Sequence, residues 1–271
     1  MGTKYKMTDE TIEVNGQTLH RIEALVDISY AKVKAGDKGG VIESEENLSQ
    51  EGNCWVGGNA RVSDKAWVSG NAQVFGNAQV FDNAQVFGGA QVFDNAQVFG
   101  GAQVFDNAQV YGNVQVFGSA RVFEDARVCG NAEVYDNAHV FSYACIYGDA
   151  VVSGRTSVYY KAEVFGNAWV DGNAQVSGNA KVCGNAWVYG DAHMGGNTLV
   201  TDRAEVYDNA YVYGNTKVDG DAHVSGNAWV VGHAHVGGNA KVGGHAQVDG
   251  DAQVSGNTVV SGTTKLSDGS A

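Results

Sequence analysis

Hydrophobic and polar positions follow a pattern that repeats every six residues over most of the chain. Every sixth residue from Val56 to Leu266 is valine, apart from three positions that are also large and apolar: Ile146, Met194 and Leu266. A second column, two residues earlier, runs from Cys54 to Thr264 and is mostly alanine; the exceptions are Cys54, Val114, Thr156, Thr198, Thr216, Thr258 and Thr264. No insertion shifts either column, so the sequence predicts one uninterrupted array of hexad repeats.

Each hexad predicts a short strand and a corner. In the repeat Ala-Gln-Val-Phe-Gly-Asn, strand side chains point alternately to two faces, so alanine and valine face one way and glutamine and phenylalanine the other. Gly-Asn is a turn pair, as is Asp-Asn at Asp82 and Asp94, because these residues tolerate positive φ. We therefore expect four-residue strands with an alanine and valine core.

A helical interpretation fails, because apolar residues two and four positions apart do not form a stripe of period 3.6. Glycine at every sixth position would also cost a helix roughly 1 kcal/mol each time. Strands this short bury their valines only by stacking on the next coil, as repeat proteins do. The simplest closure uses three hexads per coil, which predicts an all-β fold of about 12 triangular coils of about 18 residues each.

The spacing of Val74, Gly76, Asn77 and Ala78 resembles the hexapeptide repeat of left-handed parallel β-helices. In that family an aliphatic residue is followed four positions later by a small one, often with Gly and Asn between them. The resemblance alone implies a left-handed parallel β-helix, since general rules for parallel crossovers favour the right hand. The chain departs from the family by placing phenylalanine or tyrosine after the aliphatic residue, where a small or acidic residue is usual.

Residues 1–50 lack the repeat and predict a small β-rich cap. Strand-like alternation in residues 11–14 and 18–28 flanks Asn15-Gly16, which is a strong hairpin signal. A solenoid needs a cap because its terminal coil otherwise exposes the core. The chain is thus expected to comprise a cap at 1–50, a repeat region at 51–266 and a polar tail at 267–271.

The cap also resembles the N-terminus of the YdcK-type hexapeptide-repeat proteins of bacteria and prophages. The resemblance rests on Val33-Lys-Ala-Gly36, Gly39-Gly40, Asn47-Leu-Ser-Gln50 and Cys54-Trp55, in that order. Because that family occurs in bacteria and prophages, the resemblance implies a bacterial or phage-encoded protein. Members of the family are generally labelled acyltransferases. The resemblance also implies an acyltransferase-like enzyme with an intersubunit site as one candidate function.

Composition narrows the setting of the protein. The net charge of −13 disfavours nucleic acid as a partner. No apolar run is long enough to span a membrane and the first residues lack a signal-peptide core, so we expect a soluble chain without a membrane partner. Cys129 and Cys183 share a face but lie three coils apart, too far for a disulfide, which favours a cytoplasmic location.

Histidines are the weak candidates for catalysis. His193, His223 and His235 occupy the outward mid-strand column. Enzymes of the β-helix class usually place a histidine in a loop pushed out of a coil, and no such loop interrupts this repeat. No two histidines stack on each other one coil, or 18 residues, apart. Zinc needs three or four converging ligands, so a trimer interface is the one route left to a metal. We expect no catalytic residue, no metal, no cofactor, and no histidine stacked on a carboxylate where a cofactor would fit.

Outward aromatic residues give the stronger signal. From Phe75 to Phe165 the position after valine is mostly aromatic, and stacking at intervals of three hexads predicts ladders on all three faces, which favours a structural role. In the C-terminal half the aromatic residues gather in two exposed groups, a pattern typical of interfaces. The candidate interface residues are Trp169, Trp187, Tyr189 and Tyr207 in one group, and Tyr211, Tyr213 and Trp229, with His193 next to them, in the other.

These observations favour a non-catalytic, rigid binding or scaffold protein that acts through its flat outer faces, with the acyltransferase as the alternative. Exposed aromatic groups predict a homo-oligomer, either a trimer, as the β-helix family implies, or a dimer. A different protein is also a compatible partner for the same surface. Nothing in the sequence identifies a substrate.

Overall fold

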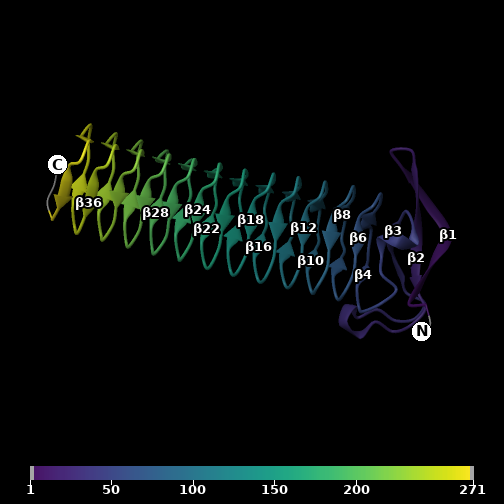
Figure 1. The fold of residues 1–271 in the computed structure, drawn as a ribbon. Helices are drawn as coiled ribbons and strands as arrows, with labels where there is room; N and C mark the ends of the chain where they lie inside the picture. Colours follow the sequence, from purple (N-terminus) through teal and green to yellow (C-terminus); the bar gives the residue numbers. More distant parts are fainter. Residues whose placement is uncertain (1–2, 269–271) are drawn as a thin grey trace. The chain divides into compact units, whose positions relative to one another are not determined.

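The structure, a computed structural model, describes residues 3–268 and divides into two compact units, 1–136 and 137–271. Within each unit short strands follow one another as successive coils (Figure 1). The prediction of an all-β parallel solenoid is confirmed, and the coils number about 13. Among the described residues the helical elements are two short 3-10 turns, η1 (Ser29–Ala31) and η2 (Glu45–Asn47). The left hand of the coil stays a prediction.

The first unit begins with an antiparallel hairpin. Strand β1 (Tyr5–Val14) pairs with β2 (Gln17–Ala24), and Asn15 and Gly16 form the turn with φ of 51° and 83°. The hairpin at Asn15-Gly16 is thus confirmed. β1 begins at Tyr5, earlier than the alternation indicates, because a shift of register between Met7 and Thr11 interrupts the period of two.

Strand β3 (Lys38–Ile42) joins the hairpin to the repeats. It pairs antiparallel with β2 and parallel with β5, where Ile42 lies opposite Val62. Leu48 bridges Val68 in the same parallel sense. The segment after β2 therefore forms a coil of its own, which accounts for a coil beyond the 12 expected from the hexads alone.

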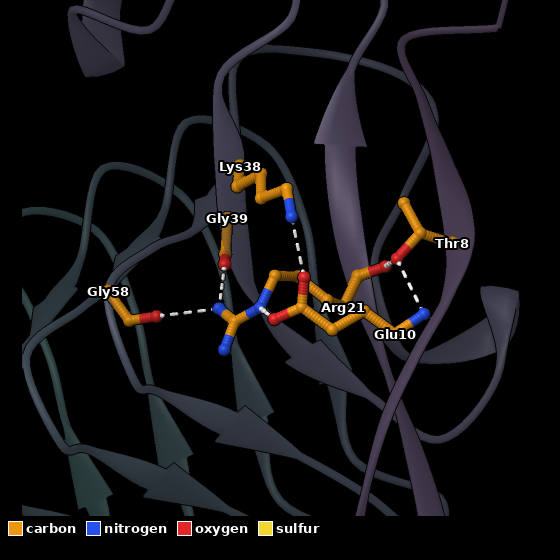
Figure 2. A network of polar contacts seen from close by, with 6 residues as sticks. All are labelled: Thr8, Glu10, Arg21, Lys38, Gly39 and Gly58. Carbon is orange, nitrogen blue, oxygen red and sulfur yellow. Dashed lines mark hydrogen bonds and ion pairs between the residues drawn. The ribbon is translucent and has the colours of Figure 1, made fainter.

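A polar network fixes this junction (Figure 2). The Arg21 guanidinium donates to Glu10 Oε1 at 2.6 Å and to the Gly39 carbonyl at 2.7 Å, and it lies 3.4 Å from the Gly58 carbonyl. Lys38 Nζ lies 2.6 Å from Glu10 Oε2. These hydrogen bonds, that from Lys38 first and that from Arg21 second, hold the pKa of Glu10 below its usual value. One carboxylate thus links β1, β2 and β3 beside the first coil.

Parallel sheets make up the rest of the first unit. One sheet continues from β3 through β5 (Arg61–Val62), β8 (Gln79–Val80), β11 (Gln97–Val98), β14 (Gln115–Val116) and β17 (Glu133–Val134). A second contains β4 (Trp55–Val56), β7 (Gln73–Val74), β10 (Gln91–Val92), β13 (Gln109–Val110) and β16 (Arg127–Val128). A third contains β6 (Trp67–Val68), β9 (Gln85–Val86), β12 (Gln103–Val104) and β15 (Arg121–Val122).

The second unit also consists of three parallel sheets. The first contains β20 (Val151–Val152), β23 (Trp169–Val170), β26 (Trp187–Val188), β29 (Glu205–Val206), β32 (His223–Val224), β35 (Lys241–Val242) and β38 (Val259–Val260). The second contains β19 (Cys145–Ile146), β22 (Glu163–Val164), β25 (Lys181–Val182), β28 (Leu199–Val200), β31 (Lys217–Val218), β34 (His235–Val236) and β37 (Gln253–Val254). The third contains β18 (His139–Val140), β21 (Ser157–Val158), β24 (Gln175–Val176), β27 (His193–Met194), β30 (Tyr211–Val212), β33 (Trp229–Val230), β36 (Gln247–Asp249) and β39 (Lys265–Ser267). Residues 269–271 of the expected tail lie outside the described residues.

The core is the stack of alanines and valines that the hexad predicts. Val98 and Val116 are register partners and are fully buried, and Ala96 in the alanine column of the same strand is buried as well. The strands of the repeats are two residues long rather than four, apart from β36 and β39, which have three. The reason is visible at Ala84, whose N–H donates back to the Phe81 carbonyl at 3.3 Å and so belongs to the corner.

Corners and outer columns also follow the prediction. Corner residues take positive φ, as at Asp82 (59°) and Gly76 (71°). Rings stack along the coils at near-parallel angles, with Phe81 and Phe99 centroids 4.9 Å apart and their planes 2° apart. Phe87 and Phe105 stack at the same spacing on another sheet, so the ladders form on more than one face.

One outward residue is placed differently from its column. Trp55 belongs to the outward mid-strand column, yet it is only 6% exposed. The cap covers it: a Cβ atom at Gly39 would lie 2.7 Å from the Trp55 ring. No helix within residues 3–268 is long and apolar enough to cross a membrane.

Two buried threonines in the alanine column allow a matched test of the core. Thr156 Oγ1 is buried without a hydrogen-bond partner among the described residues, whereas Thr198 Oγ1 donates to the Gly195 carbonyl at 2.6 Å. Thr156→Val should raise the free energy of unfolding by about 1 kcal/mol, and Thr198→Val should lower it by about 1 kcal/mol. Urea titration of both variants checks the signs. A shift of both in the same direction would contradict the assigned hydrogen bonding.

Candidate functional site

Two tryptophans form the centre of an exposed aromatic surface in the second unit. Trp169 and Trp187 are register partners on β23 and β26, with ring centroids 5.4 Å apart and planes 11° apart. Each precedes a core valine, so the indole must project outward. The two side chains remain 40% and 47% exposed.

Two tyrosines continue this surface. Tyr189 and Tyr207 stack with centroids 5.0 Å apart, and the Tyr189 ring meets Trp187 edge-on at 6.4 Å. We call Trp169, Trp187, Tyr189 and Tyr207 the tryptophan face. The structure thus brings together the four residues that the three-hexad register groups, and their role as an interface stays a prediction.

A carboxylate and an imidazole border the tryptophan face. Tyr189 Oη donates to Glu205 Oε2 at 3.0 Å, and His223 Nδ1 lies 3.5 Å from the same oxygen. The His223 ring also meets Tyr207 edge-on at 6.2 Å. Burial and the contact with Glu205 raise the pKa of the Tyr189 hydroxyl, so it remains a donor at neutral pH.

The remaining candidates gather on a different sheet. Tyr211 stacks on Tyr213 at 4.4 Å and lies 4.9 Å from Trp229, with the planes of the second pair tilted by 30°. His193 is the neighbour on the other side, 6.3 Å from Tyr211. Burial, together with Tyr213, raises the pKa of Tyr211. We call Tyr211, Tyr213 and Trp229 the tyrosine cluster; because its strands belong to the third sheet, the seven predicted residues make two separate surfaces.

A half-buried ionic cluster on the second sheet was not predicted. Asp219 Oδ1 lies 2.9 Å from His235 Nε2, and Asp219 Oδ2 lies 2.5 Å from Lys217 Nζ. Burial of Asp219 opposes its ionisation, but Lys217 and His235 together hold the pKa of the carboxyl below its usual value. Gly237 leaves the space that this contact uses, since a Cβ there would lie 2.9 Å from His235 Nε2.

Two histidines contact carboxylates, and the expectation that none does so where a cofactor would fit stays a prediction. His223 stacks directly with Glu205, and His235 reaches Asp219 diagonally, from one coil and one column away. Matching residues at spacings of 18 does not reveal such diagonal pairs, because His235 and Asp219 are 16 residues apart in the sequence. A glycine in the column after valine, as at Gly237, is the signal that indicates one.

The structure does not bring the weak catalytic candidates together. His193, His223 and His235 lie on the third, first and second sheets of the second unit, respectively. Within residues 3–268 no group of three or more His, Cys, Asp or Glu side chains is arranged to hold a metal ion. Cys54 is buried, with its sulfur 3.1 Å from Lys4 Nζ.

Coils of three hexads with an alanine and valine core define a parallel β-solenoid protein. The family model described as the YdcK beta solenoid repeat matches residues 108–124 and 174–190, one segment in each unit and each about one coil long. The β-solenoid thus contains repeats of the YdcK type, the type that the sequence resemblance predicted. A search of curated proteins gave no match.

The ionic cluster predicts a pH-dependent contribution to stability. The pKa of the Asp219 carboxyl is lower in the folded protein than in the unfolded chain. The ionised carboxylate therefore stabilises the fold fully at a pH above its pKa in the unfolded chain, and this stabilisation disappears as the pH falls through its pKa in the folded protein. Asp219→Asn should lower the free energy of unfolding by about 1 kcal/mol at neutral pH, and the deficit should close in acid. Urea titration between neutral pH and about pH 3 checks this.

Asp191→Asn provides the control for that experiment. Asp191 is an exposed corner residue that accepts from Asn173 Nδ2 at 2.8 Å, and an asparagine there extends the corner amide ladder. Its substitution should change the stability by less than about 0.5 kcal/mol. A deficit of Asp219→Asn that stays constant with pH would contradict the ionic account.

Proposed function

We propose that this protein is a non-catalytic binding or scaffold protein whose tryptophan face associates with a second copy of the same chain. The observation that carries the proposal is the exposure of Trp169 and Trp187 within one continuous group of four rings. Tryptophan and tyrosine are enriched in the energetically dominant parts of interfaces, because each buries a large area at a low entropic cost. Soluble monomers rarely leave such a patch uncovered.

The order of residues along the first sheet supports a second copy as the partner. From β23 to β35 the outward mid-strand column runs Trp169, Trp187, Glu205, His223 and Lys241. Rings occupy one end and cationic or protonatable groups the other. When two copies face each other across a two-fold axis perpendicular to this column, the column of one runs opposite to that of the other, which places cations over rings.

Flatness supports the same partner. The strands of the sheet succeed one another with a constant one-coil register, so the outer surface presents ridges at about the 4.8 Å strand spacing. Two copies carry ridges of identical spacing and can interdigitate over several coils. The net charge of −13 on each copy opposes this association, so salt should strengthen it.

Self-association gives a direct test of the proposal. The parent should sediment as a dimer at micromolar concentration, more completely at moderate than at low salt, and Trp187→Ser should shift it toward monomer by at least about tenfold in dissociation constant. Trp229→Ser, in the tyrosine cluster, is the matched control and should sediment like the parent. A trimer would indicate the three-fold packing that the β-helix resemblance implies.

Two outcomes would overturn the proposal. A parent that stays monomeric under both salt conditions excludes the second copy as the partner. An oligomer that responds to Trp229→Ser and not to Trp187→Ser would move the interface to the tyrosine cluster. Circular dichroism of each variant separates these outcomes from a loss of folding.

An acyltransferase with its site between protomers is the second candidate, favoured by the contact between His235 and Asp219. A general base needs an imidazole whose orientation a carboxylate fixes, and Asp219 holds His235 at 2.9 Å. The exposed, loop-free sheet around the pair offers nothing to enclose a carrier, which is why the binding role ranks first.

Turnover separates the two candidate functions. We expect purified protein to show no saturable hydrolysis or transfer from acetyl-coenzyme A, and His235→Ala, His223→Ala and His193→Ala to match the parent. Thiol release, followed with and without amine and sugar acceptors, is the measurement. Saturable release that His235→Ala abolishes while the other two variants keep it would reverse the ranking.

A further inference from the structure

An aromatic ladder in the first unit ends at an open rung. Phe75 and Phe93 stack with centroids 4.9 Å apart, and Tyr111 follows Phe93 at 4.8 Å. One coil before Phe75 the same position holds Gly57, so the ladder has no ring there. Phe75 is accordingly 37% exposed. A flat ring placed at the empty rung would continue the ladder.

A cleft surrounds this rung. It has a volume of about 850 Å³, within the range typical of small-molecule sites, and its lining includes Tyr30, Trp55, Gly57, Gln73 and Phe75. The segment carrying η1 forms one wall, which is attached to the coils by a hydrogen bond from Gln73 Nε2 to the Tyr30 carbonyl at 3.2 Å. We call this space the cap cleft.

Two donors at the cap cleft have no partner among the residues that the structure describes. The Trp55 ring lies largely under the cap, with 6% of the residue exposed, but its indole nitrogen is not among the fully buried polar atoms, and within residues 3–268 the N–H makes no hydrogen bond. Its Nε1 lies 3.4 Å from the position that a Cβ at Gly57 would take, beside the empty rung. The exposed Lys32 ammonium, which also lines the cleft, makes no ion pair with any described residue.

A second ladder shows that the cap is able to cover such an end. Phe81 also begins a ladder, with Ser63 one coil before it. There the hairpin residues Val14, Gln17 and Leu19 line the space, and about 110 Å³ remains. The chain thus closes one ladder end with its own residues and leaves the other open beside two unpaired donors.

We propose that the cap cleft binds a small molecule with a flat aromatic ring and an anionic group. The ring stacks on Phe75, a ring-borne acceptor takes the Trp55 N–H, and the anion pairs with Lys32. Of the charged residues that line the cleft, Lys38 pairs with Glu10, whereas the Lys32 ammonium makes no ion pair with a described residue and is the group available to an anion. An aromatic carboxylic acid and a nucleoside monophosphate share this chemistry.

Calorimetric titration of the full chain distinguishes these sources. The probes are 4-hydroxybenzoate and adenosine 5′-monophosphate, with cyclohexanecarboxylate as an anion of similar size whose ring is not flat. At least one aromatic probe should saturate one site per chain, and cyclohexanecarboxylate should bind at least about tenfold more weakly. The aromatic probe that binds more tightly shows whether the natural ligand is an aromatic carboxylic acid or a nucleoside monophosphate.

Variants locate the site. Trp55→Phe keeps a ring and removes the N–H, and it should weaken binding about fivefold. Lys32→Asn removes the charge, suits the positive φ of 55° at this position, and should weaken binding by a similar factor. Lys34→Gln, which lies in the same segment outside the cleft lining, should bind like the parent.

The proposal is overturned if neither aromatic probe saturates, or if cyclohexanecarboxylate binds as tightly as they do. It is also overturned if both variants bind like the parent. Lys32 is exposed and outside the core, so Lys32→Asn remains decisive even where Trp55→Phe lowers the melting temperature. Self-association through the tryptophan face is measured separately, so the two proposals fail independently.

Discussion

Stacking of like residues one coil apart is the constraint on which the rest of the structure depends. A strand of two residues has no stability of its own, and each coil is held by backbone hydrogen bonds to the coils on either side, such as Gln85 N–H to the Ala102 carbonyl at 2.9 Å. Any insertion would displace every later valine from the core. The same constraint forces chemically similar side chains into columns, which is why rings stack on rings and amides on amides outside as well as inside.

The register made most of the fold predictable. The valine and alanine columns predicted which residues are buried, because these side chains face inward. The glycine and aspartate positions predicted the corners, because a corner residue must adopt a positive φ. The hairpin turn at Asn15-Gly16 was predictable for the same reason. The start of β1 was not, since the irregularity between Met7 and Thr11 removes the alternation that would reveal it.

Side-chain contacts between neighbouring columns were not predictable from vertical stacking. Two glycines in the column after valine admit a neighbouring side chain: Gly195 admits Tyr213, and Gly237 admits the contact between His235 and Asp219. In each case the missing Cβ lets a ring lie across the surface instead of projecting from it. The tryptophan face needed no such device, because Trp169 and Trp187 pair within one column, and its four residues were therefore identified from spacing alone.

The two-sided pairing of β3 has a consequence for how the chain reaches this structure. The β1–β2 hairpin uses contacts close in sequence, so it can form before any coil closes. Strand β3 pairs antiparallel with β2 of this hairpin, and its other edge pairs parallel with β5. The locally formed sheet therefore provides an edge onto which the first coil of the repeats can pair. Each later coil of the first unit closes a loop of similar length onto the edge left by the one before it, at a similar entropic cost. Assembly can therefore advance in the direction of synthesis, with growth at a single edge, so that each newly emerged segment meets a finished surface rather than another unfolded repeat of nearly identical sequence.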